Sequence, residues 1–439
     1  TVDYGGFHDL FYGVTLLTNG KLLASGTGSR SLKTDFVVAR YETDGSVDAT
    51  FGTNGSSIVG TNRPGGGHAT HVFLFSDGKT VLTGTVNPGG LNTLGALRAM
   101  PDGTLDTTFN TSGRVLHTIF STGASNGALI QTDGRLILAG TRILAQSTIV
   151  SLAGTDILFV RYETSGALDT SYATDGSAQI PIITSGRVAS ILLDTRGRTV
   201  CTGDTSEFSP QDFMVCRIET NGALDTSFFS SGYRVFDVGA QSSAKDVVLG
   251  TNGNLSFAVH ASGVGFVAYR LLTDGNLDPS FDGDGKRVFD GGDGEQSTGI
   301  HIDEMDRTWV LGRNDSGVAV ARLFSDGAAD TSFHTEGIFT ADIGMSSEEL
   351  ISMVPTPSGK FLINGNGIYN GWYSMLLMRL LSNGTLDTAF SADGFLQDSI
   401  TQGYNTAGQM VGLPDGRVVV AGGGGYNGSS VFAVIQYFP

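Results

Sequence analysis

The segment Leu224-Asp225-Thr226-Ser227-Phe228 decides the fold, because versions of it occur seven times along the chain. Each version has an aspartate in its second position and an aromatic residue in its fifth, and a glycine turn and a short apolar strand follow, as in Arg234-Val235-Phe236. The other copies start at Val47, Leu105, Leu168, Leu277, Ala329 and Leu386. Self-similarity at a period of roughly 55 residues is typical of a repeat protein.

A β-hairpin precedes each copy of the motif, and the hairpin element itself occurs eight times. Two apolar runs flank a turn such as Asn19-Gly20, Asp77-Gly78, Asp133-Gly134 or Asp415-Gly416, and both residues of such turns can adopt positive φ. A third strand follows the hairpin, and the strand after the motif is the fourth. We call them strands A, B, C and D of the repeat.

Short strands at even spacing without helical periodicity predict radial repetition. The sequence therefore predicts an all-β, eight-bladed β-propeller with four antiparallel strands per blade, forming a single domain over residues 1–439. The segment Thr1 to Tyr4 has the pattern of a lone D strand, and the chain ends with a C strand, Val431 to Tyr437. We expect this N-terminal strand to complete the last blade and remove two open sheet edges.

An arginine on strand C stands eight residues before every motif aspartate. The seven pairs are Arg40/Asp48, Arg98/Asp106, Arg161/Asp169, Arg217/Asp225, Arg270/Asp278, Arg322/Asp330 and Arg379/Asp387. The eighth repeat lacks the aspartate and has Gln436 in place of the arginine. This pattern predicts a partly buried Arg–carboxylate contact across the C–D turn, with bidentate geometry available to the guanidinium. Seven equivalent copies favour a structural role, so we assign no catalytic residue.

The repeat resembles the delta-60 repeat family, whose consensus joins a hairpin to a Gly-x-Leu-Asp-x-Ser-Phe segment. The resemblance covers essentially the whole chain, with departures such as Tyr172 for Phe and Ala329 for Leu. It implies propeller-like blades and a secreted or cell-surface bacterial protein, either alone or as part of a larger multidomain or oligomeric one. It supplies no catalytic residues.

Composition narrows the function classes. Glycine is abundant, with 64 residues against 10 prolines, and 40% of residues are hydrophobic, which disfavours disorder. A net charge of −17 repels phosphate backbones, so we expect no nucleic-acid partner. No apolar run has the length of a membrane span, and the chain opens with Thr1, as a processed, secreted chain would.

Cys201 and Cys216 fall on adjacent strands, B and C of the fourth repeat. We favour two buried thiols there and leave a disulfide open as the alternative.

The B–C and D–A loops differ from blade to blade and should share one face, so we place the ligand site there. The candidate residues are aromatic and amide side chains around blades 7 and 8: Tyr369, Asn370, Trp372, Tyr373, Tyr404, Asn405, Tyr426 and Asn427. Aromatic faces stack on sugar C–H groups, and amides bind hydroxyls. We therefore predict adhesion to a glycan or a protein on a cell surface. The alternative is that these aromatics pack on their own loops.

Three other segments are weaker candidates. Arg63, His68 and His71 lie in one loop without a third metal ligand nearby, and residues 141–155 form an apolar loop suited to a partner. The acidic residues Asp282, Asp284, Asp290, Asp293 and Glu295 offer calcium ligands without the spacing of a known loop, so we predict no cofactor, with calcium as an alternative. The rival functions are a glycan hydrolase or lyase, which needs two converging carboxylates, and a structural spacer in a surface fibre.

Overall fold

The structure is a computed structural model that describes residues 9–30, 33–59, 66–87, 92–121, 127–143, 155–180, 186–205, 212–238, 241–289, 296–314, 317–401, 403–426 and 429–438. These residues form eight antiparallel sheets, and the fold is an all-β, eight-bladed propeller with four strands per blade, as predicted. Helical structure within the described ranges is limited to short 3-10 turns such as Phe109–Thr111. None of the described helices is long and apolar enough to cross a membrane.

The chain divides into two compact units, and the first comprises Thr1–Thr118 and Gly344–Pro439. It holds blades 1, 2, 7 and 8. Blade 1 consists of β1 (Leu10–Leu16), β2 (Leu22–Arg30), β3 (Lys33–Tyr41) and β4 (Ser56–Val59), and blade 2 of β5 (Gly67–Leu74), β6 (Thr80–Val86), β7 (Asn92–Ala99) and β8 (Arg114–Ser121). Blade 7 consists of β25 (Ser346–Pro355), β26 (Phe361–Tyr369), β27 (Trp372–Leu380) and β28 (Phe395–Asp398), and blade 8 of β29 (Tyr404–Gly412), β30 (Val418–Tyr426) and β31 (Ser429–Tyr437).

The second unit, Ile119–Ile343, holds blades 3 to 6. Blade 3 consists of β9 (Gly127–Ile130), β10 (Leu136–Ile143), β11 (Thr155–Tyr162) and β12 (Ser177–Ile180), and blade 4 of β13 (Arg187–Leu193), β14 (Thr199–Asp204), β15 (Phe213–Ile218) and β16 (Tyr233–Phe236). Blade 5 consists of β17 (Ser242–Leu249), β18 (Leu255–Ala261), β19 (Gly265–Leu271) and β20 (Lys286–Phe289), and blade 6 of β21 (Gln296–Ile302), β22 (Thr308–Asn314), β23 (Gly317–Leu323) and β24 (Ile338–Ala341).

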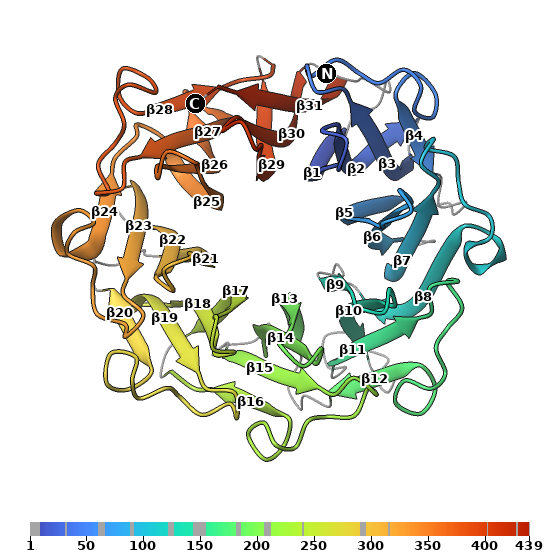
Figure 1. Ribbon diagram of the computed structural model, residues 1–439, viewed down its shortest axis with the longest axis horizontal. Helices are drawn as coiled ribbons and strands as arrows, with labels where there is room; N and C mark the ends of the chain where they lie inside the picture. Colours follow the sequence, from blue (N-terminus) through green and yellow to red (C-terminus); the bar gives the residue numbers. More distant parts are fainter. Residues whose placement is uncertain are drawn as a thin grey trace. The chain divides into compact units, whose positions relative to one another are not determined.

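Inside the first unit, β29–β31 lie beside β1–β4 (Figure 1). Phe11 of β1 stacks on Phe432 of β31 with ring centroids 4.2 Å apart, and both are fully buried. The backbone N–H of Asp9 donates to Ser430 Oγ at 2.7 Å. The predicted closing strand, Thr1 to Tyr4, lies outside the described residues, so blade 8 has three described strands.

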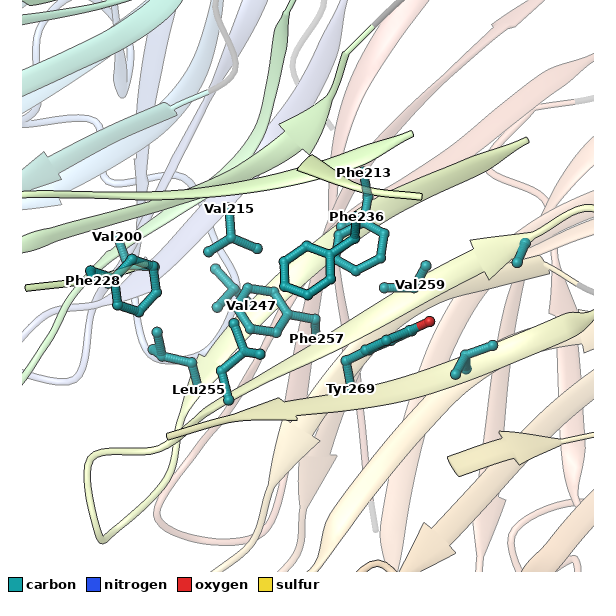
Figure 2. Close-up of a cluster of buried hydrophobic side chains, with 14 residues drawn as sticks. Val200, Phe213, Val215, Phe228, Phe236, Val247, Leu255, Phe257, Val259 and Tyr269 are labelled. Carbon is teal, nitrogen blue, oxygen red and sulfur yellow. The ribbon is translucent and has the colours of Figure 1, made fainter. Parts of the chain in front are cut away.

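The hydrophobic core lies between neighbouring blades rather than within one sheet. Figure 2 shows one such cluster, in which Val200, Phe213, Val215, Phe228 and Phe236 of blade 4 meet Val247, Leu255, Phe257, Val259 and Tyr269 of blade 5. Phe213 and Phe236 stack with centroids 4.6 Å apart and planes 2° apart. Each of these sheets therefore buries both faces, which explains why middle strands such as β6, β14, β15 and β23 are buried at every position.

Both residues of the A–B turns can adopt positive φ, but only one residue of each turn does so. In the turn at Asn19-Gly20, only Gly20 does, at φ 82°, and its N–H donates to the carbonyl oxygen of Leu17. The Asn19 side chain instead accepts from the N–H of Lys21 at 3.1 Å, which caps the turn. A two-residue turn with both residues at positive φ occurs in the B–C connection of blade 7, at Asn370 (52°) and Gly371 (82°).

Cys201 and Cys216 are directly opposite each other on β14 and β15, and both are fully buried free thiols. Burial, followed by the neighbouring Cys201, raises the pKa of the Cys216 thiol, which keeps it protonated and unreactive at neutral pH. We expect thiol titration of the denatured, unreduced protein to find two free thiols. A protein in which neither cysteine reacts would show that the pair is oxidised.

Candidate functional site

The predicted Arg–Asp contact is present in all seven repeats that contain the aspartate. The arginine Nε lies 2.6 to 2.8 Å from Oδ2 of the aspartate in every pair. The motif aromatic lies beneath the guanidinium, 4.2 to 4.7 Å from the arginine Cζ to the ring centroid. The motif thus joins strand C, the C–D turn and the blade core.

The bidentate geometry available to these guanidinium groups is not used by Arg40 and Arg217, whose other nitrogens have further partners. Nη1 of Arg40 donates to the carbonyl oxygen of Pro101 in the next blade at 2.5 Å, and Nη1 of Arg217 donates likewise to Thr273. The second carboxylate oxygen is also occupied: Oδ1 of Asp48 accepts from the N–H and the hydroxyl of Thr50. Arg161 and Arg270 also donate to a carbonyl oxygen of the next blade, so four of these arginines tie neighbouring blades together as well as closing their own turns.

A second cation contacts most of the motif aspartates, and the sequence reasoning missed it. Lys21 Nζ lies 2.8 Å from Oδ2 of Asp48, and Arg198 Nη1 lies 2.7 Å from Oδ2 of Asp225. Equivalent contacts come from Lys79, Arg135, Arg307 and Lys360, and from the neutral Asn254 in blade 5. The sequence does contain a signal for this contact: in six of the seven repeats that contain the aspartate, a lysine or arginine directly follows the A–B hairpin turn.

These partners set the protonation state of the motif aspartates. Burial alone would raise the pKa of Asp225, but hydrogen bonds from Ser227 and Arg217 outweigh it and lower the pKa to about 2. In Asp48, burial is likewise outweighed, here by Lys21, Thr50 and Arg40. The carboxylates are ionised and fully engaged by the fold, which supports the structural role expected of them.

Four exposed aromatic side chains belong to β26, β27 and β29, at the opposite end of blades 7 and 8 from the aspartate motif. We call Tyr369, Trp372, Tyr373 and Tyr404 the aromatic patch. Tyr369 and Trp372 are paired across the tip of the β26–β27 hairpin, and they are 40% and 54% exposed. Tyr373 and Tyr404 lie with ring centroids 5.0 Å apart and planes tilted by 54°, which joins the hairpin of blade 7 to β29 of blade 8.

The predicted amide residues have different surroundings. Asn370 occupies the turn at the tip of the hairpin. Asn405 is only 1% exposed: its Oδ1 accepts from the N–H of Thr401 at 2.7 Å, and its Nδ2 donates to the carbonyl oxygen of Gly403 at 2.8 Å. Asn405 also reaches the carbonyl oxygen of Tyr373 at 3.4 Å, so it fixes the loop under the aromatic patch.

The last two predicted residues are less completely described. Tyr426 ends β30, and its backbone pairs with Ser429. Asn427 lies outside the described residues. Tyr369 and Trp372 are thus opposite each other on one face of the β26–β27 hairpin, and Tyr373 contacts Tyr404 from the other face, with Asn405 supporting the adjoining loop. The placement of the side chains at 426 and 427 stays a prediction.

The weaker sequence candidates do not converge in the described ranges. His71 contacts Thr70 at 2.9 Å, while His68 lies before the bulge in β5 and contacts Thr27 at 3.4 Å, and Arg63 is outside the described residues. Asp282 pairs with Arg287 at 3.1 Å; Asp290, Asp293 and Glu295 are not described. No group of three or more His, Cys, Asp or Glu side chains suited to a metal occurs among the described residues. Most of the apolar loop at 141–155 lies outside them.

One further polar group was not anticipated. Asp246 lies on β17 directly after a bulge, and burial raises the pKa of its carboxyl despite hydrogen bonds from the N–H of Val247 and the hydroxyl of Ser190. The contact with Ser190, at 3.0 Å, joins blades 4 and 5. Asp246 thus has a structural partner in the neighbouring blade.

Comparison with known proteins agrees with the fold. The model of the family described as "Domain of unknown function (DUF5122) beta-propeller" matches residues 17–51, 76–109, 197–228, 256–281, 356–390 and 413–439. Five of these stretches end at the aromatic of the aspartate motif. No curated protein sequence gives a significant match.

Solved structures resemble the chain in fold alone. Prolyl oligopeptidase B from Galerina marginata is 11% identical with a TM-score of 0.51, over 95% of this chain and 55% of that one. A puromycin hydrolase is 11% identical with a TM-score of 0.47, over 95% of this chain and 58% of that one. The chain thus spans little more than half the length of these two proteins. Taken with the family match, the sheets and the repeated motif identify the chain as a β-propeller repeat protein.

Proposed function

We propose that this chain is a delta-60-type propeller, secreted or displayed on a bacterial surface, that binds a neutral glycan through the aromatic patch without cleaving it. The observation that carries the proposal is the exposure of four aromatic rings on two adjoining blades, Trp372 most of all. Large aromatics contribute most to stability when buried, so a cluster held in solvent favours a role in binding.

The chemistry of the patch favours sugars over other ligands. Each tyrosine offers a flat face for C–H groups and a hydroxyl for hydrogen bonds, and Asn370 adds an amide at the hairpin tip. The net charge of −17 disfavours acidic polysaccharides, which leaves neutral or amino sugars as the best match. A shallow surface of this kind binds weakly at one site, so adhesion would depend on several copies acting together.

The patch also has a rigid support, which lowers the entropy cost of binding. The tip is a two-residue turn between two nine-residue strands, so Tyr369 and Trp372 do not sit on a long loop. Asn405 holds the adjoining loop through its buried amide. A binding surface that is already ordered loses little conformational freedom when the ligand arrives.

Trp372→Ala tests the proposal. We expect it to weaken binding to a glycan identified by array about tenfold or more, because it removes the largest stacking face, and to leave the melting temperature unchanged. Phe324→Ala is the matched control, since Phe324 is 42% exposed in blade 6 and belongs to no patch. Equal binding by the Trp372→Ala and Phe324→Ala proteins would place the ligand elsewhere.

A further inference from the structure

A tyrosine on the innermost strand of blade 1 lies next to the aromatic patch. Tyr12 is at the bulge of β1, where the register with β2 shifts between Phe11 and Gly13. It is half-buried, whereas its neighbours Phe11 and Gly13 are buried. Bulges redirect a side chain out of the regular alternation of a strand, and they often occur beside functional sites.

Blade 8 places its own inner strand against this tyrosine. Gly408 of β29 packs so closely on the backbone of Tyr12 that an added Cβ would lie 2.7 Å from the Tyr12 carbonyl oxygen. The next residue, Gln409, has its side-chain Oε1 over Gly13, 3.4 Å from where a Cβ would be. β29 also begins with Tyr404 of the patch. One strand therefore connects the aromatic patch to Tyr12 and Gln409.

Both side chains have hydrogen-bonding capacity to offer. Among the described residues, neither the Tyr12 hydroxyl nor the Gln409 amide contacts a hydrogen-bond partner, and Gln409 is exposed. Burial, followed by the nearby Tyr404 phenol, raises the pKa of Tyr12, so its hydroxyl stays protonated and can donate. At about 3.3 Å per strand residue, Tyr404 and Gln409 are roughly 16 Å apart, which is the length of several linked sugar rings.

We propose that Tyr12 and Gln409 form a second subsite that continues the aromatic patch along β29, so that the site takes an extended β-linked neutral oligosaccharide rather than a single sugar. This inference rests on the proposed function. In extended β-linked chains, the rings present flat C–H faces to Trp372 and Tyr404, while hydroxyls further along the chain reach the Tyr12 phenol and the Gln409 amide. Short oligosaccharides occupy the patch alone, and long ones occupy both subsites.

The probes are cellobiose and cellohexaose, with chitobiose and chitohexaose as a second series, titrated against the full chain. We expect Tyr12→Ala and Gln409→Ala each to weaken binding of the hexasaccharide about tenfold, the effect of losing one such contact, and to leave the disaccharide unaffected. Trp372→Ala should weaken binding of both lengths. Tyr12→Phe keeps the ring and tests the hydroxyl without risk to packing.

Thr298→Ala is the matched control, because Thr298 occupies the equivalent bulge in β21 of blade 6. If the Tyr12 and Gln409 variants bind both hexasaccharides as the unaltered chain does while Trp372→Ala still weakens them, the second subsite is overturned and the proposed function stands. If Trp372→Ala changes the affinity for neither the disaccharides nor the hexasaccharides, the proposed function itself fails. Absence of binding by the unaltered chain to either hexasaccharide overturns the β-linked substrate class.

Discussion

Replacing Asp225 with alanine is expected to destabilise the protein by about 3–5 kcal/mol, the usual effect of leaving a buried charge without its partner. Asp225 is 3% exposed and contacts both Arg217 and Arg198, whose side chains are 2% and 7% exposed. The substitution leaves the buried Arg217 guanidinium without its carboxylate, takes one of two close carboxylate partners from Arg198, which keeps Asp194, and also removes the acceptor for Ser227. Urea unfolding monitored by fluorescence measures the change.

Asp415→Ala is the control for this experiment. Asp415 also accepts from a backbone N–H two residues on and pairs with an arginine, Arg417, but its side chain is 51% exposed. Exposed pairs of this kind contribute about 1 kcal/mol or less. If Asp225→Ala lowered the free energy of unfolding no more than Asp415→Ala, the motif aspartates would not hold the blades together.

Acid should unfold the protein over a narrow range, between about pH 4 and pH 2. All seven motif aspartates have a lowered pKa in the folded state: burial would raise it, but hydrogen bonds and cations outweigh burial. In the unfolded chain an aspartate titrates near 3.9, so the unfolded state binds more protons below that value. The stabilisation is therefore complete above about pH 5 and is lost as the pH falls through the folded pKa values.

Asp246 has the opposite effect, because burial raises its pKa and protonation therefore favours the folded state. Asp212 behaves in the same way, because burial and then the nearby Asp237 raise its pKa, but these two carboxyls stand against seven motif aspartates, so the net change on acidification is destabilising. Melting temperatures measured from pH 7 to pH 2 should fall steeply below pH 4. A melting temperature at pH 3 equal to that at pH 7 would contradict the ionised state of the motif.

The repeat and its strands could be predicted from the sequence because each signal is local. The spacing of eight residues between Arg217 and Asp225 spans one turn, so the contact follows from the repeat itself. The other partners of that arginine could not be predicted in the same way, since the carbonyl oxygen of Thr273 belongs to the next blade. Arg217 does not use the available bidentate geometry for this reason: contacts between blades depend on packing that one repeat does not encode.

Part of the candidate site was also predictable. Neighbouring variable loops bring Tyr373 and Tyr404 together, as strand order implied. The sequence predicts Asn405 as a ligand contact, whereas alternation along β29 turns it inward next to the exposed Tyr404. Tyr12 was missed because it belongs to a repeated strand, and only the bulge, which the sequence does not reveal, turns it toward the neighbouring blade.

The most direct test of the account is a glycan array probed with the unaltered chain and with the double variant Trp372→Ala/Tyr404→Ala, followed by chromatography of each bound glycan after incubation. The account predicts that the unaltered chain binds neutral extended glycans and returns them intact, and that the double variant binds none of them while melting at the same temperature. Undiminished binding by the double variant, or cleavage of a bound glycan by the unaltered chain, would contradict it.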